Sequence, residues 1–215
     1  MNREKRANIA QETVDVLGQG HYVTESGKKI DIAESLRTSV ENTRLYSPDE
    51  LKNIEPDSQN NPDLEVNVEN KSTIEVARNI IEGGDKDPFV LNFASALNPG
   101  GGFLRGTGAQ EESLARSTGL YACISKVPEY YQRNKDSGTA LYTDNMIYSP
   151  RVPVIRDEEG NFLETPYFIS ILTAPAVNRG AIARNEPENL DKVKRIMCRR
   201  IGKVLKVSAN RGHTV

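Results

Sequence analysis

Two adjacent carboxylates, Glu111 and Glu112, have the residue type and setting that best suit catalysis in this sequence. Carboxylic acids cleave glycosidic bonds when one of them protonates the departing oxygen as an oxocarbenium-like centre develops. Neighbouring residues on a helix point about 100° apart, so the two side chains cannot serve one atom symmetrically. We therefore expect one carboxylate at the reacting bond and the other on hydroxyl groups beside it.

The position of this pair also allows a purely structural interpretation. Both residues fall in the first turn of an expected helix, where acidic side chains complement the helix dipole. A helix N-terminus lowers the pKa of a carboxyl group, whereas a general acid needs a raised one. Catalysis therefore requires that ligand phosphates, a second carboxylate and the exclusion of water outweigh the dipole.

A glycine-rich loop comes directly before the two glutamates. The run from Asn98 to Glu112 reads NPGGGFLRGTGAQEE and holds five glycines within nine residues, at positions 100, 101, 102, 106 and 108. Glycine admits positive φ angles and lets a ligand approach the backbone closely. The N–H groups that such a loop exposes, with a helix start just beyond, favour an anion such as a phosphate or diphosphate. Arg105 is either a phosphate contact or an exposed loop cation.

The flanking segments predict that this loop lies at the edge of a sheet. Residues 89–93, FVLNF, form a short apolar run typical of a buried strand, and residues 111–124 have the pattern of a helix. Open α/β sheets bind ligands at the carboxyl ends of their strands. The loop therefore lies where a ligand is expected.

The rest of the chain predicts a mixed α/β fold. An N-terminal helix ends at Gly18–Gly20, a hairpin follows with Tyr22, Val23, Ile30 and Ile32 on its strands, and residues 55–63 form a loop. Capping boxes at Ser47–Glu50 and Ser72–Glu75 predict two helix starts. The remaining expected elements are strands at 64–70, 146–155 and 167–175 and a basic helix at 187–209. The basic helix is either a solvated outer face or a surface for phosphate or nucleic acid.

Composition excludes several classes of protein. Counting 28 Lys and Arg against 30 Asp and Glu gives a net charge of −2, so nucleic acid is not an expected partner. Cys123 and Cys198 lie too far apart for a disulfide framework or a thiolate zinc site, which indicates a reducing compartment. With only His21 and His213, neither a Ser-His-Asp triad nor a multi-histidine metal site is expected. We expect no metal and no cofactor.

The chain also lacks the signals of a membrane or secreted protein. No apolar run reaches the roughly 18 residues that cross a bilayer, and the charged start MNREKRANIAQETVDVL differs from a signal peptide. We therefore expect a cytoplasmic protein without a membrane partner.

The run Gly100–Gly102, followed after seven residues by Gln110-Glu111-Glu112, resembles the signature of bacterial-type poly(ADP-ribose) glycohydrolases, which are macrodomain proteins. The segments RANIAQETVDVLGQGHY, NFASALNPGGGFLRGTGAQEESLARSTGLY and ILTAPAVNRGA also look like family segments. The resemblance implies a three-layer α/β/α sandwich with a mixed sheet. Residues 1–62 would then be an N-terminal extension, and residues 63–215 would be the macrodomain core.

The resemblance also implies roles for single residues. Glu112 would protonate the ribose leaving oxygen and then activate water, while Glu111 would hold ribose hydroxyls. Asn98 would contact the distal ribose, and Gly100, Gly101 and Gly102 would pass close to that ribose and the diphosphate. Phe103 and Gln110 would support the ligand-binding loop. The implied partners are ADP-ribose, poly(ADP-ribose) and ADP-ribosylated proteins.

Family members continue past the equivalent of His213–Val215 into a strand and a second glycine-rich loop that embraces the diphosphate. We expect this chain to lack both and to be C-terminally incomplete relative to the family. Two functions follow as alternatives. One is a glycohydrolase that cleaves ribose–ribose bonds of poly(ADP-ribose) or ADP-ribosyl–protein linkages. The other is a module that binds ADP-ribose with weak or no hydrolysis.

Overall fold

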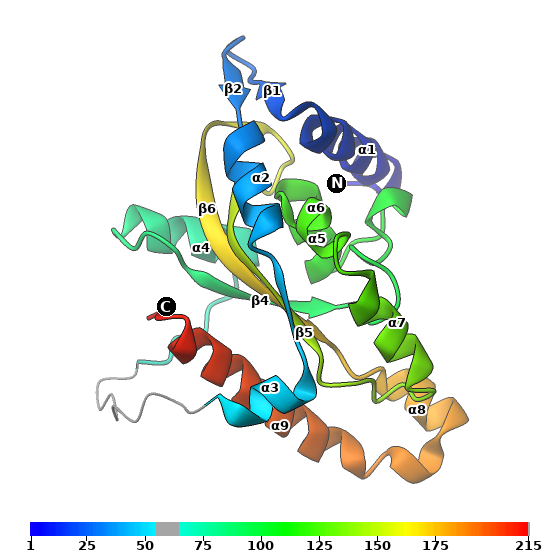
Figure 1. Ribbon diagram of the computed structural model, residues 1–215. Coiled ribbons are helices and arrows are strands. Elements are labelled where there is room, and N and C mark those ends of the chain that lie inside the picture. The colour runs from blue at the N-terminus through cyan, green and yellow to red at the C-terminus, as the bar shows by residue number, and fades with distance from the viewer. Residues whose placement is uncertain (55–64, 215) are drawn as a thin grey trace.

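A four-stranded mixed sheet forms the centre of the computed structural model, which describes residues 1–54 and 65–214 (Figure 1). The strand order is β3-β5-β6-β4, in which β4 runs parallel to β6 and the other pairs are antiparallel. The strands span Arg44–Tyr46 (β3), Phe89–Ala94 (β4), Met146–Arg156 (β5) and Phe162–Pro175 (β6). The predicted loop at residues 55–63 and the predicted domain boundary at 62/63 lie outside the described residues.

Both faces of the sheet are buried, because helices cover each of them. Ile147, Val154 and Ile171 point to one face, where they pack against helices α4, α5, α6 and α7. Met146 and Leu172 point to the other face, where they pack against α3 and α9. The bounds are Pro48–Asn53 (α3), Thr73–Glu82 (α4), Gln110–Ser117 (α5), Leu120–Ile124 (α6), Pro128–Asp136 (α7) and Lys192–Asn210 (α9). The predicted three-layer α/β/α architecture is confirmed.

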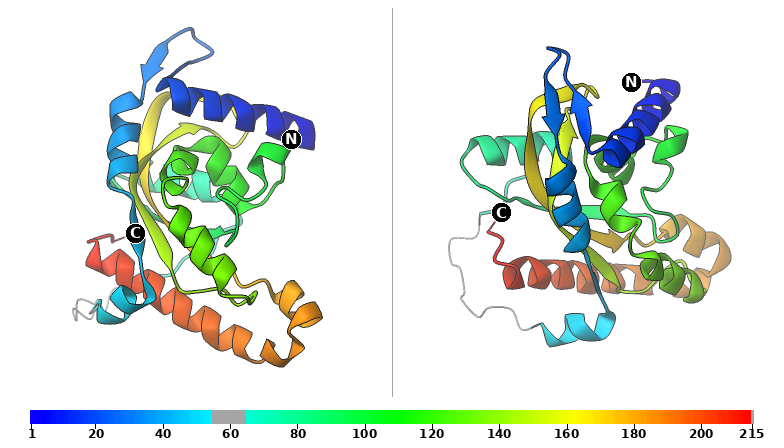
Figure 2. Two further views of the ribbon diagram at one scale, coloured as in Figure 1. Left: turned by 45° about the vertical axis from the view of Figure 1, so that its right-hand side comes forward. Right: turned by 45° about the horizontal axis from the view of Figure 1, so that its top comes forward.

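The N-terminal region packs against the helical layer that contains α5 (Figure 2). Helix α1, Arg3–Gln19, ends at Gly20, whose φ of 74° places it in the left-handed region typical of a C-cap. The helix thus continues through Gly18, past the predicted break. A hairpin of β1, His21–Val23, and β2, Lys29–Asp31, confirms the predicted one, but Ile32 lies just after β2, at the N-cap position of the following helix, α2, Ala33–Glu41. The same region also contributes β3 to the central sheet.

Two sequence predictions are wrong because of tertiary contacts. The helix predicted over 111–124 is split into α5 and α6. Thr118 forms an isolated β-bridge with Val154, and the N–H of Gly119 donates to the Pro153 carbonyl. Residues 65–69 form no strand, and Val66 and Val68 are 77% and 96% exposed. The alternation of apolar residues there has no neighbouring strand to pair with.

The end of the chain also differs from its prediction. The long basic helix begins at Lys192, because Pro187–Asn189 form a separate 3₁₀ turn (η2) after the short helix α8, Arg179–Asn185. After α9 the described chain makes a turn, and residues 213 and 214 have no strand pairing. Within residues 1–54 and 65–214, no helix combines the length and apolarity that a membrane crossing needs.

Candidate active site

The glycine-rich loop leaves the carboxyl end of β4 and enters α5 through a short 3₁₀ turn, η1, Phe103–Arg105. Gly100 and Gly101 have φ angles of 67° and 58°, which glycine adopts without strain. A Cβ on Gly101 would lie 2.6 Å from Oε1 of Glu112 and 3.0 Å from Oε2 of Glu111. The backbone at Gly101 therefore passes directly over both carboxylates, and the two side chains converge there despite their angular separation on the helix.

Glu111 is a buried carboxyl group with one hydrogen-bond donor. It is 4% exposed, and its Oε2 accepts the N–H of Ser95 at 2.7 Å. Its Oε1 is buried and has no hydrogen-bond partner among the described residues. Burial, opposed by the Ser95 N–H and reinforced by the charge of Glu112, raises the pKa of Glu111 to about 7. Burial thus outweighs the helix dipole at this residue, and Glu111 holds a proton near neutral pH.

Glu112 lies beside it and is tied to the loop. The side chain is 7% exposed, and its Oε1 accepts the N–H of Gly102 at 3.0 Å. Its other oxygen, Oε2, accepts no hydrogen bond within the described residues. Glu112 therefore has one oxygen that fixes its orientation and one that is available to a ligand.

The glycine N–H groups do not serve as the sequence led us to expect. The N–H of Gly101 donates to the Asn98 carbonyl at 3.0 Å, and that of Gly102 is used by Glu112. The prediction of exposed anion donors is therefore wrong for these two glycines. The glycines instead allow the loop backbone to pack closely against neighbouring side chains. A Cβ on Gly100 would lie 2.8 Å from the Phe103 ring, and one on Gly102 would collide with Thr107.

Gln110, the first residue of the QEE run, bonds to the edge of β4. Its Oε1 accepts the N–H of Phe93 at 2.9 Å, and its Nε2 donates to the Leu91 carbonyl at 2.8 Å. The amide thus occupies the positions that a neighbouring strand would use, and it anchors the first turn of α5 to the sheet. This geometry fits the supporting role implied for Gln110.

Phe103 and helix α1 stabilise the glycine-rich loop by packing and hydrogen bonds. The Phe103 side chain is 1% exposed and packs with Ala10 of α1 and Ala115 of α5. Arg3 and Arg6 of α1 donate to the carbonyls of Arg105 and Gly106 at 2.9 and 2.8 Å. The N-terminal helix therefore takes part in positioning the loop.

Two polar residues that the sequence did not single out surround the carboxylates. Ser95 supplies the N–H to Glu111, and the amide of Asn92, wholly buried, faces Glu111 and donates to Oγ1 of Thr173 at 3.1 Å. Asn92 interrupts the apolar run FVLNF, and this break was the available signal. The role of Ser95 comes from its backbone, which no side-chain pattern reveals.

A hollow of about 450 Å³ adjoins the loop on the side of Asn98, which is exposed. The exposed Arg105 lies near Gly102, since its Nη2 is 3.7 Å from the place of a Cβ there. Asn98 and Arg105 therefore flank the carboxylate pair from the solvent side. Within the described residues no group of three or more His, Cys, Asp or Glu side chains could hold a metal ion.

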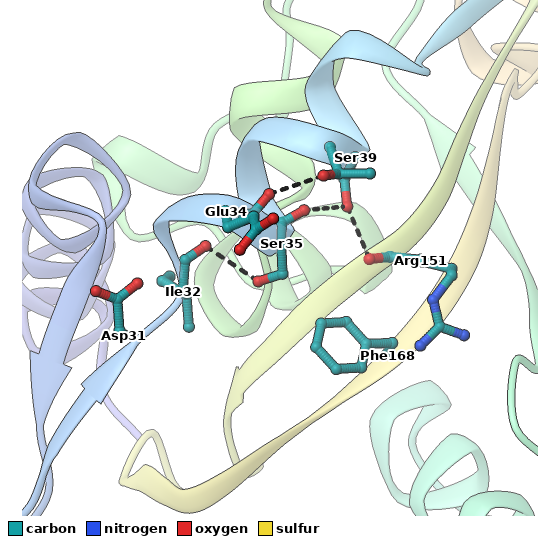
Figure 3. Close-up of a pocket in the computed structure, with 8 residues that line it drawn as sticks. Asp31, Ile32, Glu34, Ser35, Ser39, Arg151 and Phe168 are labelled. Carbon is teal, nitrogen blue, oxygen red and sulfur yellow. Dashed lines mark hydrogen bonds between the residues drawn. The ribbon is translucent and has the colours of Figure 1, made fainter.

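A larger hollow, about 640 Å³, lies elsewhere, between α2 and the strands β5 and β6 (Figure 3). Its serine hydroxyls already donate to backbone carbonyls, as Ser39 does to Arg151 at 2.7 Å. The Arg151 guanidinium covers the Phe168 ring, 5.1 Å from its centroid. This hollow contains neither of the converging glutamates, so the chemistry of the chain is expected at the glycine loop instead.

Comparisons with known proteins show which family the chain resembles. Residues 10–157 match the family described as microbial-type PARG, catalytic domain. A structure of poly(ADP-ribose) glycohydrolase from Thermomonospora curvata, bound to the inhibitor ADP-HPD, is 40% identical with a TM-score of 0.90, covering 98% of this chain and 77% of that one. The enzyme from Deinococcus radiodurans, bound to ADP-ribose, is 37% identical with a TM-score of 0.74, covering 83% and 73%.

A search of curated protein sequences gave no match. The family match spans more than half of the chain, and both structures share its fold and are 37% or more identical to it over the matched residues. The chain therefore belongs to the family of microbial-type poly(ADP-ribose) glycohydrolases.

Proposed function

We propose that this protein hydrolyses the ribose–ribose O-glycosidic bonds of poly(ADP-ribose), or ADP-ribosyl–protein linkages, and that Glu112 and Glu111 are its catalytic residues. The observation that carries the proposal is the convergence of two buried carboxylates on Gly101, one of them with a pKa raised to about 7. The raised pKa of Glu111 keeps a proton at this site near neutral pH, and general acid catalysis needs such a proton.

In the proposed reaction Glu112 gives a proton to the departing ribose oxygen through Oε2, the oxygen that no protein group occupies. The bond between that oxygen and the anomeric carbon breaks as positive charge develops on the remaining ribose. Glu112, now a carboxylate, then takes a proton from the water that attacks the anomeric carbon. Glu111 bonds to ribose hydroxyls through its unpartnered Oε1, and the proton taken from water restores the acid form of Glu112.

The loop has a positioning role in this proposal. Gly100 and Gly101, which lack side chains, allow the ribose and diphosphate to lie against the backbone, and Asn98 contacts the distal ribose from the solvent side. Gly102 fixes the orientation of Glu112, while Phe103 and Gln110 keep loop and helix in register with the sheet. Arg105 adds a positive charge near the diphosphate.

The decisive experiment measures ADP-ribose released from poly(ADP-ribose) by the wild type and by Glu112→Gln and Glu111→Gln. Loss of general acid catalysis lowers kcat by about a hundredfold or more. A matched control is Glu129→Gln, because Glu129 is an exposed glutamate in the first turn of α7 and shares only the dipole environment. Equal rates for the wild type and Glu112→Gln would refute the catalytic assignment.

Calorimetry with ADP-ribose, combined with the release assay, separates the enzyme from the binding module. The enzyme binds ADP-ribose and releases it from polymer, whereas a module binds without turnover. Failure to bind ADP-ribose would contradict both functions.

We also propose that residues 1–62 form an extension that supports the core at 63–215, and that the protein acts in the cytoplasm. The contacts of Arg3 and Arg6 with the loop support the first proposal. The two free cysteines, Cys123 and Cys198, support a reducing compartment.

A further inference from the structure

The hollow beside Asn98 contains a feature that the proposed reaction does not use. Its walls are residues 94–98 after β4, residues 176–179 after β6, and the side chain of Tyr142. Its volume of about 450 Å³ is within the usual size of small-molecule sites. It opens next to the carboxylate pair, since Ser95 in one wall donates to Glu111.

Tyr142 has an unfavourable backbone conformation. Its φ is 58°, in the left-handed region that costs a bulky residue on the order of 1 kcal/mol or more. Within the described residues only Arg151 is another non-glycine with a positive φ. Such conformations persist where the surroundings enforce them, and they concentrate at ligand sites.

The surroundings of Tyr142 do enforce it. Arg200 of α9 is 2% exposed and donates to the carbonyls of Leu141 at 3.0 Å and Thr143 at 2.9 Å, one on each side of Tyr142. Asn134 of α7 accepts the N–H of Thr143 at 2.9 Å. These bonds hold the segment around Tyr142 while its half-buried side chain lines the hollow.

The same arginine connects the wall after β6 to this segment. It donates to the Pro175 carbonyl at 2.6 Å, at the end of β6, while its charge is balanced by Asp144 at 3.2 Å. The N–H of Asn178 donates to the Ala140 carbonyl at 3.1 Å. The hollow is therefore a preformed site whose aromatic wall is held in a fixed position relative to β4 and β6.

We propose that this hollow binds the adenosine of the ADP-ribose unit on the leaving-group side of the scissile bond, with its adenine against the Tyr142 ring. The proposal rests on the proposed function. In the polymer the departing oxygen belongs to the adenosine ribose of the neighbouring unit, so that adenosine must lie within a few bonds of Glu112. The hollow adjoins the carboxylates on the side of Asn98, and the aromatic residue Tyr142 lines it.

The chemistry of the walls fits a nucleoside that continues into a diphosphate. A tyrosine ring stacks on a base without needing a specific hydrogen-bond pattern. The Asn98 amide lies at one wall for ribose or base edges, and the exposed Arg179 lies at the rim for the diphosphate. A substrate with a single ADP-ribosyl group leaves this hollow unused, so Tyr142 selects for polymer.

The test compares Tyr142→Asn with Tyr142→Phe in the full chain. Asparagine tolerates the left-handed conformation and removes the ring, whereas phenylalanine keeps the ring. Tyr142→Asn is expected to raise KM for poly(ADP-ribose) about tenfold, the loss of one base–aromatic stack, with kcat changed much less. Tyr142→Phe is expected to stay within about twofold of the wild type in both constants.

A binding measurement keeps this test independent of turnover. In the Glu112→Gln background, the dimer of ADP-ribose is expected to bind about tenfold more tightly than ADP-ribose itself, and Tyr142→Asn removes that difference. Equal loss of affinity for monomer and dimer would overturn the proposal, because Tyr142 would then contact the unit that stays bound. Equal affinity of the parent for monomer and dimer would also overturn it.

The outcome is distinguishable from failure of the proposed function. If the wild type cleaves polymer and Tyr142→Asn cleaves it with an unchanged KM, the subsite is wrong and the function stands. If the wild type does not cleave polymer, the function fails, and the dimer binding still decides the subsite.

Discussion

Glu111 and Asp144 are equally buried carboxyl groups, 4% and 6% exposed, with opposite electrostatic environments. Glu111 receives one backbone N–H and faces Glu112, and burial raises its pKa to about 7. Burial also acts against ionisation of Asp144, but Lys203, Arg199 and Arg200 together hold its pKa below the usual value. The partners therefore decide whether a buried carboxyl group keeps its charge.

This difference separates a reactive carboxyl group from a structural one. Asp144 is an ionised partner that neutralises the buried Arg200 and so keeps the walls of the hollow in place. Among the described residues no cation pairs with Glu111 and one of its oxygens has no partner, which is unfavourable for the apo protein and suits a group that must exchange a proton. The predictions that follow test the two sites against each other.

The largest effect is expected for Asp144→Asn. The variant leaves Arg200 buried without a counterion, which costs about 3–5 kcal/mol of unfolding free energy. Urea denaturation at pH 7 measures the loss. Because the wild-type pKa is lowered, the contribution of Asp144 is present above about pH 4 and is lost below it, so wild type and variant should converge in acid. A constant difference at all pH values would contradict this interpretation.

Glu111→Gln is expected to change stability in the opposite direction. The pKa of Glu111 is raised in the folded state, so between its ordinary value of 4.5 and about 7 the folded protein binds more protons than the unfolded one. The free energy of unfolding of the wild type therefore falls as pH rises through this window. At pH 8 the variant should be more stable by about 3 kcal/mol, and near pH 4 the two should be alike. Thermal unfolding at both pH values checks the sign.

Gly101→Ala should damage the carboxylate pair and leave Asp144 intact. The added methyl group meets both carboxylates and is placed on a residue with a φ of 58°. Displacing reactive groups by about 1 Å lowers the rate on the order of a hundredfold. Polymer hydrolysis measures this, and Gly138→Ala is the matched control, because Gly138 has a φ of 66° and open space around its Cα. Equal activity of the two variants would contradict the close approach at Gly101.

The pH profile of the wild type gives a smaller effect. If the proton on the pair is the catalytic one, kcat/KM falls by about tenfold for each pH unit above about 7, where Glu111 ionises. A rate that stays flat from pH 6 to pH 9 would show that this proton is not used. Glu129→Gln should leave the pH profile unchanged. It should change the free energy of unfolding by no more than about 0.5 kcal/mol, as expected of an exposed first-turn glutamate.

The elements with local signals were predictable from the sequence. Ser47 and Glu50 form the expected capping box at the start of α3, with both reciprocal bonds present. The apolar run at 89–93 forms β4, and the glycine loop follows it into α5 as predicted. These features depend on residues a few positions apart, which the chain itself brings together.

The sequence predictions that were wrong share a different cause. Residues 65–69 alternate like a strand yet pair with none, and the helix predicted over 111–124 breaks where Thr118 and Gly119 bond to β5. At the site, neither the contribution of Ser95, which acts through its backbone, nor that of Tyr142, which lies thirty residues after Glu112, follows from local spacing. These outcomes depend on which distant segments become neighbours.

The sequence by itself determined the chemistry available to this protein: two adjacent carboxylates, a glycine-rich loop before them, and a strand and helix to carry both. Tertiary structure alone decided what those groups can do. The packing of α5 against β4 and Gly101 buries Glu111, and this burial raises its pKa. The path of α9 brings Arg200 to the segment around Tyr142. Burial and charge pairing arise between residues far apart in the chain, so spacing along the chain does not encode them.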